Sequence, residues 1–140
     1  MQVQPYLNFN GRCEEALEFY KKAVGAQVQM LMRFKEAPTE GTDHKPTPGT
    51  EDKVMHSCML IGESAVMASD GYCTNAKSTF DGISLTLNPP TEPEAQKFFK
   101  ALSTGGNVQV PLTKTFFSPA FGVLTDPFGV TWMVMVEEKK

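Results

Sequence analysis

The stretch EALEFY at residues 15–20 returns as EAQKFF at residues 94–99, displaced by 79 positions. In each copy the alanine and the last aromatic residue are spaced to lie on one face of a helix. Each copy also follows a short alternating strand pattern and precedes three more. We therefore predict the α+β class, with two modules of element order βαβββ. One such module leaves a face of its sheet uncovered, which favours two modules packed as one domain over residues 1–140.

The first module, about residues 1–70, changes from a strand period to a helical period after Asn10. Glu18 is placed to pair with Lys22, and Gly25 to end the helix. The Pro-, Gly- and Thr-rich segment 36–52 has no period, so we expect it to be mobile. The predicted elements are a strand at 3–9, a helix at 12–24, and strands at Gln27–Lys35, Val54–Ile61 and Ala65–Ser69.

The second module, about residues 80–137, repeats this order. Thr91 and Glu94 form a capping box at the start of its helix. The sequence DPFG at 126–129 is typical of a type I turn, which gives Asp126 a structural role. The remaining predicted elements are strands at 83–87, 108–112, 121–125 and 130–136.

Composition excludes several classes of protein. The 140 residues carry a net charge of −3, which argues against nucleic acid as a partner. The longest apolar stretch, residues 130–136, is too short to span a membrane, so no membrane partner is expected. Three separated cysteines without a C-x-x-C pair, together with no recognisable signal peptide, predict a reduced protein in the cytoplasm.

The chain resembles the vicinal oxygen chelate superfamily, which includes glyoxalase I, extradiol dioxygenases and bleomycin-resistance proteins. The resemblance rests on AxxFYxxAxG at 16–25 and DPFGVxW at 126–132. Within the superfamily the chain is similar to the PhnB-like branch, sometimes labelled a 3-demethylubiquinone methyltransferase domain. The matches to this branch are PYLxF at 5–9, His56, MxSD at 67–70 and FGxxxD at 121–126.

The resemblance implies an open, barrel-like mixed sheet around a cavity, with the helices outside. Metal-dependent members bind one divalent ion through four cavity-facing side chains. The matching positions here hold Gln4 or Pro5, Ala68, Gly82 and Met133. Most of these side chains cannot bind a metal, and a thioether suits copper(I) rather than oxygen-favouring divalent ions. We therefore expect neither a metal nor a cofactor.

Alternation along the strands predicts which side chains face the cavity. Leu7, Phe9, Leu85 and Trp132 should face the helices. His56 and Cys58 share a strand face, but at roughly 6–7 Å they are too far apart for a direct hydrogen bond. His56 is instead a candidate general base or hydrogen-bonding residue, and one of Phe116 and Phe117 is expected to contact a ligand or a partner subunit. The predicted ligand-binding residues are Tyr6, Asn8, His56, Ser84, Phe116 and Met133.

These observations favour a protein that binds a small organic molecule, and they leave open whether it catalyses a reaction. One alternative is a metal-dependent lyase or dioxygenase with ligands moved to His56 and Asp70. Another is a scaffold or interaction protein whose cavity is filled by its own side chains. The methyltransferase label has no support from the residues, because no glycine-rich turn for S-adenosylmethionine is present.

We also expect a homodimer, which the resemblance implies and the strand pattern favours. An open sheet has edge strands, and an edge strand promotes association unless it is charged or covered. The two candidate edges, Gln27–Lys35 and Val108–Thr115, carry few charges. Phe116 or Phe117 of one subunit is then placed to reach the cavity of its mate.

Overall fold

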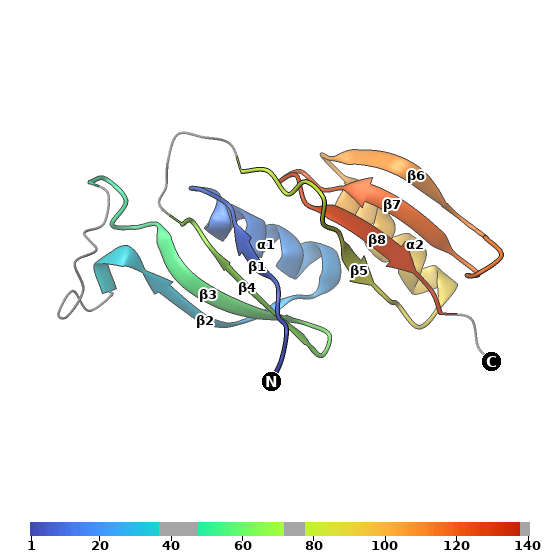
Figure 1. Ribbon diagram of the computed structural model, residues 1–140, viewed down its shortest axis with the longest axis horizontal. Coiled ribbons are helices and arrows are strands. Elements are labelled where there is room, and N and C mark those ends of the chain that lie inside the picture. Colours follow the sequence, from blue (N-terminus) through green and yellow to red (C-terminus); the bar gives the residue numbers. More distant parts are fainter. Residues whose placement is uncertain (37–47, 72–77, 138–140) are drawn as a thin grey trace. The chain divides into compact units, whose positions relative to one another are not determined.

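The computed structural model describes residues 1–36, 48–71 and 78–137 (Figure 1). The chain divides into two compact units, Met1–Ser78 and Thr79–Lys140. Each unit holds a four-stranded mixed sheet that is not closed and a helix on one face of that sheet. The α+β class and the repeated βαβββ order are thus confirmed. Most of segment 36–52, together with His44 and Cys73, lies outside the described residues.

The first unit has the strand order β1-β4-β3-β2, with β1 parallel to β4 and the other neighbours antiparallel. Strand β1 is shorter than predicted, because Val3 is fully exposed and only the three residues from Tyr6 pair as a strand. Strand β2 ends at Arg33, where a turn of 3₁₀ helix begins. The elements are β1 (Tyr6–Asn8), α1 (Cys13–Val24), β2 (Gln27–Arg33), η1 (Phe34–Glu36), β3 (Val54–Ile61) and β4 (Ser64–Ser69).

The second unit repeats the topology, with the order β5-β8-β7-β6. Strand β5 is parallel to β8, and the other neighbours are antiparallel. Both predicted edge strands, β2 and β6, lie at the edges of their sheets. The elements are β5 (Leu85–Leu87), α2 (Glu92–Ser103), β6 (Asn107–Thr113), β7 (Phe121–Thr125) and β8 (Thr131–Met135).

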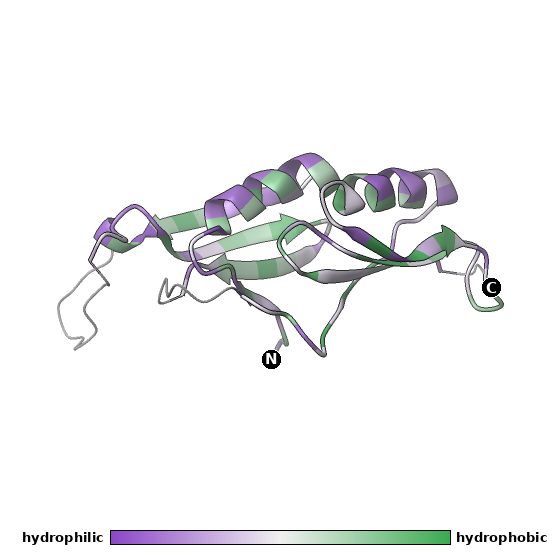
Figure 2. Cartoon of the chain, turned by 90° about the horizontal axis from the view of Figure 1, so that it is seen from above, coloured by the Kyte–Doolittle hydropathy of each residue, from purple (hydrophilic) through white to green (hydrophobic). Residues whose placement is uncertain are grey.

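The repeated helix motif occupies equivalent positions in its two units. Ala16 and Ala95 are fully buried, and Tyr20 and Phe99 are buried one turn later. Purple hydrophilic and green hydrophobic residues alternate along each helix, and each helix lies on one face of its own sheet (Figure 2). The apolar stripe of each helix therefore covers that face, as its period predicts.

The predicted end of α1 and start of α2 are confirmed, whereas the ion pair predicted within α1 has a different partner. Gly25 is in the left-handed conformation that ends α1. The Thr91 side chain accepts a hydrogen bond from the backbone N–H of Glu94 at 3.4 Å. Glu18 pairs with Lys21 at 2.8 Å rather than with Lys22, because residues three apart also share a helix face.

The predicted turn at 126–129 is confirmed by a hydrogen bond of 3.0 Å from the Gly129 N–H to the Asp126 carbonyl. The buried Asp126 carboxylate also accepts a bond of 2.8 Å from Nε1 of Trp132. Asp126 is therefore structural. No helix in the described part of the chain is long and apolar enough to cross a bilayer.

Candidate functional site

The sheet of the first unit has an open face, which we define as the face turned away from α1. A row of four paired residues crosses it: Tyr6, Met67, Cys58 and Met30. Met32 lies opposite His56 in the neighbouring row. None of these side chains is fully buried, whereas Met59 and Ala68 on the helix-facing side are completely buried. The alternation predicted from sequence is therefore correct in this unit.

Tyr6 and His56 are joined on the open face. The Tyr6 hydroxyl lies 3.0 Å from Nδ1 of His56, and the rings stack with centroids 5.6 Å apart and planes 24° apart. If the hydroxyl donates, the imidazole keeps an N–H at Nε2; if the imidazole donates, the hydroxyl keeps its proton. In either tautomer the pair can donate one hydrogen bond to a ligand.

The two described cysteines are free, and their environments differ. Cys58 is half-buried on the open face, two residues after His56 on the same strand. Cys13 is fully buried at the start of α1, and burial raises the pKa of its thiol to about 12. Cys13 is therefore chemically inert at neutral pH, and Cys58 is the thiol that a ligand on the open face would meet.

Asn8 also lies on the exposed side of the sheet, but its side chain binds the backbone of the turn that follows β1. Its Oδ1 accepts a hydrogen bond of 2.9 Å from the N–H of Asn10, which has a positive φ of 48°. A Cβ at Gly71 would stand 2.3 Å from the Asn8 amide, so a glycine is required there. The predicted role of Asn8 in ligand binding stays a prediction.

The other predicted site residues lie in the second unit. Ser84 is exposed just before β5, and Met133 is half-buried in a row with Thr86 and Val123. Phe116 is 95% exposed and meets Phe117 edge-on at 5.1 Å. Met133 lies on the predicted face of its strand, and the ligand contacts predicted for these residues stay predictions.

One position inferred from the resemblance is wrong by one residue. Met67, rather than Ala68, stands beside Tyr6 on the open face, as Met133 stands beside Thr86 in the second unit. Ala68 points to the helix and is fully buried. The reason is the period of two along a strand, where a shift of one residue moves a side chain to the other face. Both units thus carry a methionine at the matching position.

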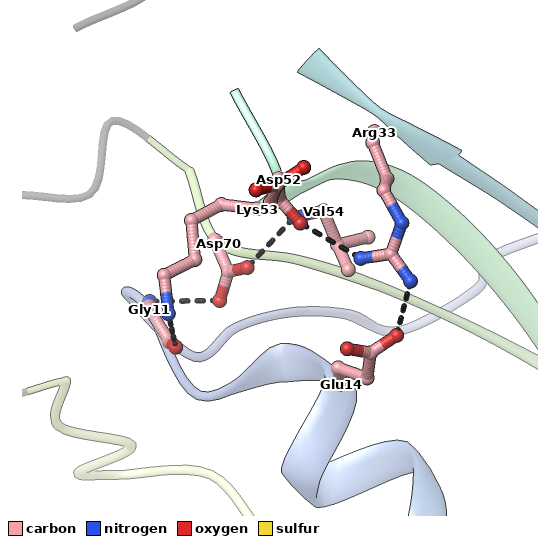
Figure 3. A pocket seen from close by; sticks show the side chains of 7 residues that line it. All are labelled: Gly11, Glu14, Arg33, Asp52, Lys53, Val54 and Asp70. Atoms are coloured by element: carbon pink, nitrogen blue, oxygen red, sulfur yellow. Dashed lines mark hydrogen bonds and ion pairs between the residues drawn. The ribbon is translucent and has the colours of Figure 1, made fainter. Parts of the chain in front are cut away.

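Asp70 has a role that the sequence did not reveal. It is 1% exposed, and its Oδ1 accepts hydrogen bonds of 2.7 and 2.8 Å from the N–H groups of Gly11 and Cys13 at the start of α1. Its Oδ2 accepts a bond of 2.8 Å from the N–H of Val54 (Figure 3). The carboxylate therefore caps α1 and ties the helix to β3. A metal at Asp70 would have to displace these bonds, which argues against the ligand set of His56 and Asp70.

A pocket of about 320 Å³ lies beside Asp70, at the start of α1 (Figure 3). Arg33 forms an ion pair with Glu14 and donates a hydrogen bond of 2.7 Å to the carbonyl of Asp52. The hydrogen bond to Glu14 is the main cause that raises the pKa of Arg33. Lys53 donates to the Gly11 carbonyl at 2.9 Å. Both cationic side chains of the pocket, Arg33 and Lys53, are thus already bound to groups of the protein itself. The pocket is lined by Gly11, Glu14, Arg33, Asp52, Lys53, Val54 and Asp70.

The described residues contain no group of three or more His, Cys, Asp or Glu side chains placed to hold a metal ion. The described open face offers the hydrogen-bonded pair of Tyr6 and His56, the Asn8 amide, the Cys58 thiol and several methionine thioethers. Such a surface can hold an apolar molecule and fix its orientation through Tyr6 and His56.

The chain matches known proteins over its whole length. Residues 1–135 match the family model described as 3-demethylubiquinone-9 3-methyltransferase. The solved structure of protein PA1353 from Pseudomonas aeruginosa is 39% identical, with 99% of each chain covered and a TM-score of 0.84. A PhnB protein from Bacillus cereus is 29% identical, with 97% of this chain and 99% of that one covered and a TM-score of 0.78.

A more distant structure shows the fold alone. A glyoxylase/bleomycin resistance protein/dioxygenase domain from Frankia is 11% identical, with 99% of this chain and 98% of that one covered and a TM-score of 0.67. The predicted PhnB-like branch is confirmed, and the distant structure confirms the predicted glyoxalase-like fold. The chain belongs to the PhnB-like family described as 3-demethylubiquinone-9 3-methyltransferase, and it shares the fold of a glyoxylase/bleomycin resistance protein/dioxygenase domain.

Proposed function

We propose that this chain is a small-molecule-binding protein that holds an organic ligand on the open face of its first sheet, without a divalent metal ion. The observation that carries the proposal is the hydrogen-bonded pair of Tyr6 and His56. Ligand sites usually combine many apolar side chains with a few polar groups. The pair of Tyr6 and His56 on a half-exposed apolar surface has this composition.

The chemistry of the open face supports binding rather than metal-dependent lysis or oxygenation. Met67 and Met133 stand where a carboxylate would be needed, and thioethers are poor ligands for oxygen-favouring divalent ions. The Asp70 carboxylate is occupied by three backbone N–H groups. Elemental analysis of the purified protein provides the check, and one bound divalent ion per chain would contradict the proposal.

We also propose that the protein is a homodimer and that it lies in the cytoplasm. Edge strand β6 has no charged residue, and Val108 and Val110 on it are each about two-fifths exposed. The exposed Phe116 adds further apolar surface in the same unit. Burial of these side chains against a second copy would protect the edge. Free Cys13 and Cys58 fit a reducing compartment.

The test is a thermal-shift screen of small organic molecules, with S-adenosylmethionine included. We expect a saturable rise in Tm for a compound that binds the wild type. His56→Ala should abolish the rise, and Tyr6→Phe should weaken it by removing the hydroxyl. Gln96→Ala, on the exposed side of α2, is the control and should behave as the wild type.

Three outcomes would count against the proposal. A hit that survives both His56→Ala and Tyr6→Phe would place the ligand elsewhere. A saturable shift with S-adenosylmethionine would favour the methyltransferase activity that the family description names. If no compound in a broad panel shifts Tm, the scaffold hypothesis gains support.

A further inference from the structure

The described strands of this protein are almost free of charge. Among all eight, Arg33 at the end of β2 is the one Asp, Glu, Lys or Arg residue. Its guanidinium is paired with Glu14 of α1, on the helix side of the sheet. No Asp, Glu, Lys or Arg residue of a described strand therefore lies on the open face of the first sheet.

The same property holds in the second unit, whose strands carry no Asp, Glu, Lys or Arg at all. The row that corresponds to Tyr6, Met67, Cys58 and Met30 consists there of Thr86, Met133, Val123 and Val110. Both rows are half-buried or exposed, so a ligand can touch them. Five charged residues of the first unit lie instead around the pocket at the start of α1: Glu14, Arg33, Asp52, Lys53 and Asp70 (Figure 3).

The lack of charge limits the class of ligand. An anion placed on this face would lose its water and find no Lys or Arg side chain of the strands in return, which is unfavourable. An apolar ring would instead exchange water for thioether and aliphatic contacts, and methionines adapt their shape to such a ring. The single donor that the Tyr6–His56 pair keeps can bind one oxygen of the ligand.

We infer that the ligand is an uncharged, largely apolar ring compound with one hydrogen-bonding oxygen, which lies at the pair of Tyr6 and His56 while its ring covers Met67, Cys58 and Met30. This inference rests on the proposed function and adds the charge and chemical class of the ligand. The inference excludes a ligand with a phosphate, phosphonate or carboxylate group.

The experiment compares two probes with one ring system, 1-naphthol and 1-naphthyl phosphate, at pH 7.5. Binding is followed by NMR of the full chain labelled with ¹³C at the methionine methyl groups. The signals of Met30 and Met67 are assigned through Met30→Leu and Met67→Leu. We expect saturable shifts of both signals with naphthol, and at least tenfold weaker binding of the phosphate, which corresponds to about 1.4 kcal/mol.

A matched pair of variants tests the cause. Met30 lies on an edge strand and is 40% exposed, so a longer polar side chain can be accommodated there. Met30→Lys adds a cation to the open face, and it should raise the affinity for naphthyl phosphate relative to naphthol. Met30→Gln, of similar size and without charge, should leave the ratio as in the wild type.

The outcomes separate the inference from the proposed function. Equal or tighter binding of the phosphate to the wild type, at the same methionines, would overturn the inference and leave the proposed site intact. No shift of Met30 and Met67 with either probe at millimolar concentration would overturn both. If these signals instead change with protein concentration alone, a second copy covers the open face, and the inference is wrong.

Discussion

Replacement of Asp70 tests the main structural feature beside the candidate site. The carboxylate accepts three backbone hydrogen bonds of 2.7–2.8 Å, from Gly11, Cys13 and Val54. Asp70→Asn keeps one oxygen for the start of α1 but turns an amide donor toward the Val54 N–H. One charged bond is then lost and the other two become neutral. A charged hydrogen bond contributes about 1.5–3 kcal/mol and a neutral one about 1 kcal/mol, so the three changes together should cost about 2.5–7 kcal/mol.

Urea unfolding followed by circular dichroism measures this loss, and a stability of about 5–15 kcal/mol leaves room to observe it. Amide hydrogen exchange supplies a local readout, because the N–H groups of Gly11, Cys13 and Val54 should exchange faster in the variant. Asp52→Asn is the control, since Asp52 is exposed and paired only with Lys35 among its side-chain partners in the described chain. The reasoning is refuted if Asp70→Asn unfolds at the same urea concentration as the wild type and protects these amides equally.

Four further predictions concern other parts of the chain. Alkylation of the native protein followed by mass spectrometry should modify Cys58 and spare Cys13, whose pKa is raised to about 12 by burial; equal labelling would show that the region under α1 opens readily. Because an unfolded thiol ionises near pH 9 and the folded Cys13 does not, its contribution to stability should decline above that pH, and titration of the urea midpoint should show this. Trp132→Phe should cost about 1.5–3 kcal/mol in urea unfolding, because it removes the indole donor to Asp126; an unchanged midpoint would mean that water replaces the indole. Light scattering should give about twice 15.4 kDa, and a smaller mass for Phe116→Ala; a wild-type mass of 15.4 kDa at every concentration would exclude the dimer.

The local elements could be predicted because their determinants are close together in sequence. The helical period, the Thr91 cap, the glycine after α1 and the turn at 126–129 each involve contacts within a few residues. Strand alternation likewise placed Tyr6 and Met133 on the side away from the helices. These patterns reflect steric and hydrogen-bonding preferences of the backbone, which act whatever the tertiary fold.

The contacts that define the candidate site depend on strand order and register instead. Tyr6 and His56 are 50 residues apart and meet because β4 lies between β1 and β3. Asp70 caps a helix that begins 57 residues earlier, where the local sequence offers no side-chain cap. Met67 rather than Ala68 lies on the open face, because Met67 is the residue that pairs with Tyr6. The sequence by itself determined which segments are helix or strand and which faces are apolar. The tertiary structure decided which distant polar groups meet, because pairing between strands is a long-range choice that no local preference specifies.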